Sequence, residues 1–265
     1  MSDTAPDTPV PPRPAATLIL LRDGLDGLEL LAMERHAGLR FAPGATVFPG
    51  GRLDAADHDP SWRDHWPHGG VPAAGVPADL AHRVAAVREC MEECAILLSR
   101  DPPQAATLAG LRAALAAGQG FGAALARAGL VPALDRMALL ARWVTPEVLP
   151  RRFDTLFFLA PAPPGQQPLC DGGEAVAALW ATPRRLLEEE RAGRRRLVFA
   201  TQMVLLRLAG CADMAAALAC ATGGTALPQP ILPCLVETDA GPVWRIPAAC
   251  GFLPLETSAE HVRLG

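Results

Sequence analysis

The chain has 265 residues, half of them hydrophobic, and a formal net charge of −4. This length is enough for one large domain with a substantial core, and the slightly acidic balance argues against a dedicated nucleic-acid binder. The seven cysteines include no CxxC pair, which disfavours structural zinc and a disulfide framework and fits a reducing, cytoplasmic compartment.

The N-terminal segment MSDTAPDTPVPPRP is rich in proline and polar residues. It lacks the basic and apolar regions of a secretory signal, so we predict a disordered lead-in over 1–14 and one domain over 15–265. No stretch of about 20 consecutive apolar residues occurs, and we therefore expect neither a membrane-spanning helix nor a membrane partner.

Two apolar runs open the domain, ATLILLR (16–22) and LELLAMERH (28–36). The turn residues DGLDG separate them, so this segment predicts a β-hairpin. FAPGATVFPGG (41–51) predicts a short strand that enters a glycine-rich turn. Residues 52–78 are rich in Asp, His, Pro and Gly and predict an irregular loop, after which a helix can begin near Asp79.

The clearest helical pattern runs over residues 81–98. At 100° per residue its apolar side chains share one side, and Glu89, Glu92 and Glu93 gather on the other. Like charges at these spacings destabilise an isolated helix by roughly 0.2–0.5 kcal/mol per pair. A solvated helix face is one interpretation. The other is a bound cation, because Mg²⁺ takes carboxylates together with substrate phosphates as ligands.

The rest of the chain mixes helices and strands without a regular alternation. Residues 103–130 predict two short helices, and further helices are expected from about Pro183 and over 199–209. Five segments predict strands: 139–144, 153–160, 174–182, ILPCLVE and VWRIP. The fold class that follows is α+β, with a mixed β-sheet and helices packed on it.

The string VFPGG, followed by an RExxEE helix, resembles the Nudix box, whose pattern is G-x5-E-x7-R-E-U-x-E-E-x-G-U with U aliphatic. The matching residues are Gly51, Arg88, Glu89, Glu92, Glu93 and Ile96. The resemblance implies the Nudix fold, a mixed sheet sandwiched between helices. It also implies that the loop and helix bind Mg²⁺ or Mn²⁺ while water attacks a diphosphate.

Two features depart from the family pattern. The middle glutamate falls at Leu80, and the late glycine is Ala95, which either strains a left-handed position or remodels the helix end. The pattern is also interrupted by a loop insertion over 52–78. This insertion, together with ordered blocks along most of the chain, resembles the branch of peroxisomal acyl-coenzyme A diphosphatases. We expect a second, helical insertion over 101–136.

The resemblance adds residues outside the helix. It implies that Glu174 supplies a further metal ligand or the catalytic base; the alternative is an ordinary acidic residue in a loop. It also implies that Gly50 offers its backbone carbonyl to the metal; the alternative is a glycine that only forms the turn. Arginine suits phosphate through its forked donors. The candidate substrate contacts are Arg35, Arg40, Gly51, Arg52 and Arg152. Instead of contacting substrate, these arginines can be ordinary surface charges, and Arg152 can form an ion pair with Asp154.

The function that these features indicate is metal-dependent hydrolysis of coenzyme A or acyl-CoA, a small nucleotide substrate. Glu89, Glu92 and Arg88 are the expected catalytic residues, with metal on the acidic cluster and Glu174. ADP-ribose and NADH share the same anhydride and stay open as substrates. A catalytically weak nucleotide-sensing module also stays open, slightly favoured by Leu80 and Ala95. The sequence leaves the oligomeric state undecided, a homodimer included.

Overall fold

The computed structural model describes residues 9–39, 42–66, 77–170, 172–221 and 227–259. Strands β1 (Arg13–Gly24) and β2 (Gly27–Arg35) form the predicted hairpin, which closes where Gly24 pairs with Gly27. The strand begins at Arg13, so the last two residues of the expected lead-in belong to β1, and residues 1–8 lie outside the described part.

The hairpin belongs to a seven-stranded mixed sheet with the order β3-β2-β1-β6-β5, in which β4 pairs with β1 and β7 with β2. The further strands are β3 (Thr46–Val47), β4 (Gly50–Arg52), β5 (Ala138–Val144), β6 (Phe153–Pro161) and β7 (Ala175–Ala181). Strands β1 and β6 run parallel, and the remaining pairs are antiparallel. The predicted α+β class with a mixed sheet is confirmed.

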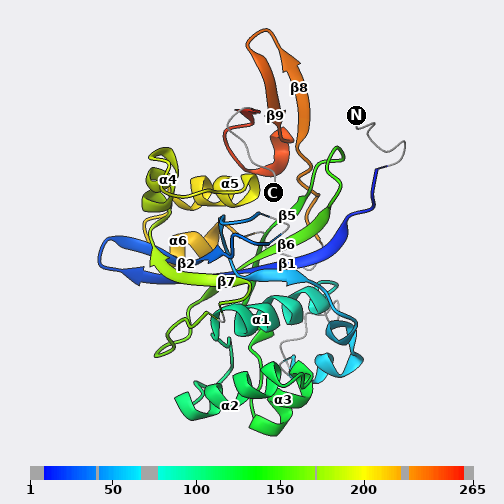
Figure 1. The fold of residues 1–265 in the computed structure, drawn as a ribbon, viewed down its shortest axis with the longest axis vertical. Coiled ribbons are helices and arrows are strands. Elements are labelled where there is room, and N and C mark those ends of the chain that lie inside the picture. Colours follow the sequence, from blue (N-terminus) through cyan, green and yellow to red (C-terminus); the bar gives the residue numbers. More distant parts are fainter. Residues whose placement is uncertain (1–8, 40–41, 67–76, 171, 222–226, 260–265) are drawn as a thin grey trace.

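Helices cover both faces of this sheet (Figure 1). Helix α1 (Leu80–Cys94) lies on one face, and the other carries α4 (Pro183–Arg191), α5 (Phe199–Leu208) and α6 (Met214–Ala219). Successive residues of a strand point to opposite faces. Leu18 of β1 accordingly packs in the core beside α1, and Ile19 packs in the core on the other face. This two-sided burial explains why β1 reads as a continuous apolar run.

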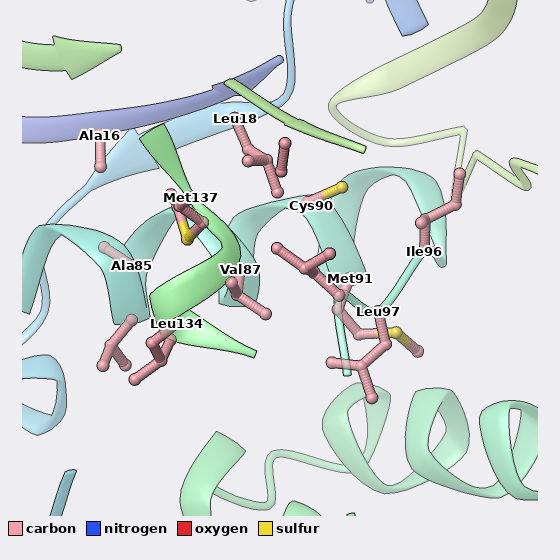
Figure 2. Close-up of a cluster of buried hydrophobic side chains, with 14 of the residues drawn as sticks. Ala16, Leu18, Ala85, Val87, Cys90, Met91, Ile96, Leu97, Leu134 and Met137 are labelled. Carbon is pink, nitrogen blue, oxygen red and sulfur yellow. The ribbon is translucent and has the colours of Figure 1, made fainter. Parts of the chain in front are cut away.

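The apolar side of α1 forms the centre of the first core. Figure 2 shows Val87, Cys90 and Met91 along the helix, near Leu18 of β1 and Leu134. Burial raises the pKa of the Cys90 thiol, which therefore packs here as a small neutral side chain. The helix ends at Cys94 rather than at residue 98, because the next residue takes a left-handed conformation with φ 55°.

The two insertions pack against each other beyond α1. The segment predicted as an irregular loop contains two short 3-10 helices, η1 (Ala55–His58) and η2 (Pro60–His65), while residues 67–76 lie outside the described part. The helical insertion contains the two expected helices, α2 (Ala105–Ala116) and α3 (Phe121–Ala128). The buried Trp62 lies with its ring 6.0 Å from that of Phe121, so the first insertion rests on the second.

Past α6 the chain forms a separate antiparallel sheet of β8 (Cys234–Thr238), β9 (Gly241–Arg245) and β10 (Glu256–Ser258). The two strand-like pieces of the sequence correspond to β8 and β9, whereas α6 and β10 had no clear pattern. All seven cysteines are free thiols. None of the helices in the described ranges is both long and apolar enough to cross a bilayer.

Candidate active site

A cavity of about 470 Å³ lies beside β4, the second half of α1 and the start of α5. Its lining includes Asp54 and the predicted site residues Arg35, Gly50, Gly51, Arg52, Arg88, Glu89, Glu92 and Glu174. Its apolar lining includes Trp143, Phe153, Phe157, Val198 and Phe199. The cavity therefore places carboxylates and arginines from the predicted site next to an aromatic wall that the sequence did not indicate.

Glu93 is the most deeply buried carboxylate of α1, with 4% of its side chain exposed. Its Oε2 accepts a hydrogen bond of 2.8 Å from the Gly50 N–H, which ties the helix to β4. Its Oε1 is buried and accepts no hydrogen bond within the described structure, although Arg35 Nη1 lies 3.9 Å away. Burial raises the pKa of Glu93 well above its ordinary range. A buried carboxylate oxygen without a hydrogen bond lowers the stability of the fold unless a further positive group contacts it.

Glu89 lies directly against the glycine turn. A methyl group added at Gly51 would stand only 2.4 Å from Glu89 Oε1, so glycine at this position lets the carboxylate approach the backbone. Burial, together with the charges of Glu92 and Glu174, raises the pKa of Glu89 to about 7, although Arg88 opposes the shift. The Glu89 carboxyl group can therefore both hold and accept a proton near neutral pH.

Arg88 links the acidic residues to the inserted segment. Its Nη1 donates to Glu89 Oε1 at 2.9 Å and to Glu92 Oε2 at 3.0 Å. Its Nε and Nη2 donate to the two carboxylate oxygens of Asp57, at 3.1 and 2.9 Å. Nη2 also donates to the Arg52 carbonyl at 3.0 Å, so all five N–H groups of the guanidinium are used. Although burial opposes its charge, these acceptors raise the pKa of Arg88 and keep it cationic.

Comparison with known proteins assigns this arrangement to a family. The crystal structure of a NUDIX hydrolase from Alicyclobacillus acidocaldarius matches with a TM-score of 0.70 and 33% identity, covering 81% of this chain and 99% of that one. Residues 69–197 also match the family model of the NUDT19 Nudix domain. The chain belongs to the Nudix hydrolase family.

Two curated Nudix relatives carry the name acyl-coenzyme A diphosphatase NUDT19. The protein from Homo sapiens is 31% identical over an alignment covering 69% of this chain, and the one from Gallus gallus is 28% identical over 60% of it. The chain spans 59% and 55% of the lengths of these relatives.

The Nudix box departs from its pattern in the way the sequence indicated, and the structure shows how each departure is accommodated. Leu80, at the place of the middle glutamate, is the first residue of α1. Ala95 keeps the left-handed conformation of the late glycine, with φ 55°, instead of remodelling the helix end. An alanine in this conformation costs about 1 kcal/mol relative to glycine.

The donors of the Nudix box fit a hard divalent cation in chemical type. Within the described ranges, no three His, Cys, Asp or Glu side chains are gathered in an arrangement ready to hold a metal ion. Glu89 and Glu92 are instead held by Arg88. The buried Glu93 Oε1, which accepts no hydrogen bond in the described part of the chain, is nevertheless an oxygen donor of the type that Mg²⁺ or Mn²⁺ takes as a ligand, and burial raises the pKa of Glu89, Glu92 and Glu93.

The remaining predicted residues have three different outcomes. Arg35, Arg52 and Glu174 line the cavity with the carboxylates of α1, and Arg40 lies outside the described residues. Arg152 is buried outside the cavity lining, where it donates to the backbone carbonyls of Thr145 and Val10, a position that does not fit the predicted substrate contact.

The alternative pairing of Arg152 with Asp154 does not occur in the structure. Asp154 forms its ion pair with Arg142 instead, at 2.6 Å. Sequence reasoning also missed Asp57. This residue stands six positions after Gly51, at the place of the pattern's middle glutamate when the spacing is counted from the glycine rather than from Arg88.

Proposed function

We propose that this Nudix hydrolase cleaves the diphosphate of a coenzyme A-type nucleotide, with Mg²⁺ or Mn²⁺ held by Glu89, Glu92, Glu93 and Glu174. The observation that carries the proposal is the acidic side of α1, with Glu89 and the buried Glu93 against the Gly50–Gly51 turn, at the edge of a cavity that also holds arginines. A bound divalent ion would neutralise phosphate charge and favour attack by water.

The chain's own residues supply the remaining functions. Arg35 and Arg52 line the cavity and can orient phosphate oxygens through their guanidinium groups. Burial raises the pKa of Glu89 to about 7 in the metal-free protein, and a bound divalent cation would favour its ionised form, in which Glu89 can act as a ligand. Gly50 fixes Glu93 through its N–H, and we keep its carbonyl as a candidate metal ligand.

The aromatic wall supports a substrate with an apolar part. Trp143, Phe157 and Phe199 line the same cavity as the carboxylates, and its volume of about 470 Å³ suits a small-molecule site. Coenzyme A and its acyl esters combine a diphosphate with such a part, and the curated relatives are named for acyl-coenzyme A. ADP-ribose and NADH are the alternative substrates. The seven free thiols fit a reducing compartment such as the cytoplasm.

A catalytically weak nucleotide-sensing module is the second candidate. It is favoured by the contacts of Arg88, which holds Glu89 and Glu92 at 2.9 and 3.0 Å, and by Leu80 in place of the pattern's glutamate. A sensor has no need for three carboxylates on one helical turn, of which Glu93 is buried and therefore costly. The hydrolase is therefore the better supported candidate.

Turnover separates the two candidates. The purified protein is incubated with Mg²⁺ or Mn²⁺ and with coenzyme A, an acyl-CoA, ADP-ribose and NADH, and the products are separated by chromatography. We expect coenzyme A to yield a nucleoside bisphosphate, and Glu92→Gln to lower the rate by at least about a hundredfold without changing thermal unfolding. Glu188→Gln, on the exposed side of α4, is the matched control. Equal inactivity of wild type and Glu92→Gln on all four substrates would favour the sensor.

A further inference from the structure

Two of the free thiols lie side by side at the ends of neighbouring helices. Cys211 follows α5 and Cys220 caps the C-terminal end of α6, and their Sγ atoms are 3.5 Å apart. We propose that Cys211 and Cys220 are a modification site, at which a peroxide forms a reversible disulfide. The inference does not rest on the proposed function, because the described lining of the large cavity includes neither thiol.

The backbone holds the two sulfur atoms near each other. The Cys211 N–H donates to the Leu208 carbonyl, and the Cys220 N–H donates to the Ala217 carbonyl, both at 3.0 Å. A disulfide bond is about 2.0 Å long, so the sulfur atoms must approach by about 1.5 Å, which rotation of the side chains can supply. The cost is small, because the Cys220 thiol otherwise donates only a weak hydrogen bond, to the Ala216 carbonyl at 3.4 Å.

The exposure of the pair suits a reaction with a small oxidant. Both thiols are half-buried, whereas Cys90 and Cys94 are buried in the core beside α1. Cys234 is exposed on β8, where it donates to the Arg245 carbonyl at 3.6 Å. A peroxide can therefore reach the pair, and each thiol of the pair has its partner in contact.

The charges around the pair assign a different part to each thiol. Burial raises the pKa of Cys211 to about 11, and Cys220 acts in the same direction, while Arg207 opposes the shift. Cys211 therefore keeps its proton near neutral pH and can donate it in a hydrogen bond to Cys220 Sγ. Such a bond favours a thiolate, which is the nucleophilic form of cysteine. Cys220 is thus the thiol that attacks the peroxide, and Cys211 is the thiol that closes the disulfide.

The reaction balances in two steps. The Cys220 thiolate attacks one oxygen of hydrogen peroxide, which breaks the O–O bond, forms a sulfenic acid and releases hydroxide, which takes up a proton to become water. The Cys211 sulfur then attacks the Cys220 sulfur. The S–S bond forms, the S–O bond breaks, and the leaving hydroxide takes the Cys211 proton to become a second water. The thiols lose two electrons in total and the peroxide accepts them, and a thiol reductant reverses the change.

The bond would close a loop around α6. Residues 211–220 contain the whole of this helix, whose first N–H, that of Met214, donates to Asp23 Oδ1 of β1 at 2.8 Å. The disulfide adds a covalent link from the end of α6 to the end of α5. Because a crosslink restricts the unfolded chain, oxidation should protect α6 against local unfolding.

The test uses the intact chain, reduced and then freed of reductant, with and without hydrogen peroxide. The protein is unfolded, its remaining thiols are blocked with N-ethylmaleimide, and an arginine-specific protease cuts it. Cleavage after Arg207 and Arg245 releases the peptide 208–245, which carries Cys211, Cys220 and Cys234. We expect oxidation to lower the mass of this peptide by two maleimide groups and two hydrogen atoms in most molecules, and dithiothreitol to restore both thiols.

Matched variants assign the bond. Cys211→Ser and Cys220→Ser should each abolish the disulfide, and either one suffices if the other does not fold. Cys234→Ser, in the same peptide, should retain it. A peptide that keeps three maleimide groups after oxidation, or whose thiols are converted only to sulfinic and sulfonic acids, would overturn the inference. So would a disulfide that persists in Cys211→Ser or is lost in Cys234→Ser.

Discussion

The carboxylate of Glu89 should make the metal-free protein less stable as the pH rises. Burial raises the pKa of Glu89 from its ordinary 4.5 to about 7, so the folded state holds the proton more tightly than the unfolded state does. The proton therefore stabilises the fold below pH 4.5, and this contribution is lost as the pH rises through about 7. Glu89→Gln, which carries no charge at any pH, should remove the loss.

The size of the effect follows from the shift in pKa. One pKa unit corresponds to about 1.4 kcal/mol, so ionising Glu89 costs the folded state up to about 3 kcal/mol above pH 7. Only 15% of the side chain is exposed, so screening by solvent is limited. For a chain of this size the gain in Glu89→Gln corresponds to a melting temperature roughly 5–10 °C higher at pH 8, and no gain at pH 4.

Thermal unfolding followed by circular dichroism in the presence of a chelator tests this prediction. The glutamine oxygen can still accept the hydrogen bond from Arg88, so packing is retained. Glu188→Gln, on exposed α4, controls for the general effect of removing one negative charge. A melting temperature of Glu89→Gln at or below that of wild type at pH 8 would show that the buried charge is not costly, and the reasoning would fail.

Two further predictions concern residues outside the carboxylate cluster. Ala95→Gly should raise the unfolding free energy in urea by about 1 kcal/mol, because the left-handed conformation at φ 55° favours glycine; an unchanged midpoint would contradict this. Arg152→Met should destabilise the fold by about 1–3 kcal/mol, since the Thr145 and Val10 carbonyls lose their donor. It should leave KM for coenzyme A unchanged, and a several-fold rise in KM would restore the substrate contact predicted from the sequence.

Periodicity and turn residues were enough to predict the elements that bury an apolar face. The hairpin of β1 and β2, helix α1 and the strands β5, β6 and β7 all carry such patterns over seven or more residues. Helix α6, with six residues, and β10, with three, are too short to show a period. The end of α1 was misplaced because alanine gives no signal of a left-handed conformation.

The residues of the site also divide into those that the sequence could predict and those that it could not. Glu89, Glu92 and Glu93 could be found because helical spacing alone places them together, and the glycine turn because its residues are contiguous. Asp57 meets Arg88 across 31 positions of sequence, and the insertion between them hides the spacing of the family pattern. Arg35 and Arg152 look alike in sequence, and only tertiary burial separates the arginine in the cavity from the one that binds backbone carbonyls.

The charges around α1 explain why the site should respond to both protons and divalent cations. Two guanidinium groups, those of Arg88 and Arg35, form ion pairs with Asp54, Asp57, Glu89, Glu92 and Glu93, which leaves an excess of three carboxylates if all are ionised. Burial raises the pKa of each glutamate in the set, so protons relieve part of this excess when no metal is bound. A divalent cation would balance most of this excess. Cation affinity should therefore increase with pH over the same range in which the metal-free protein loses stability.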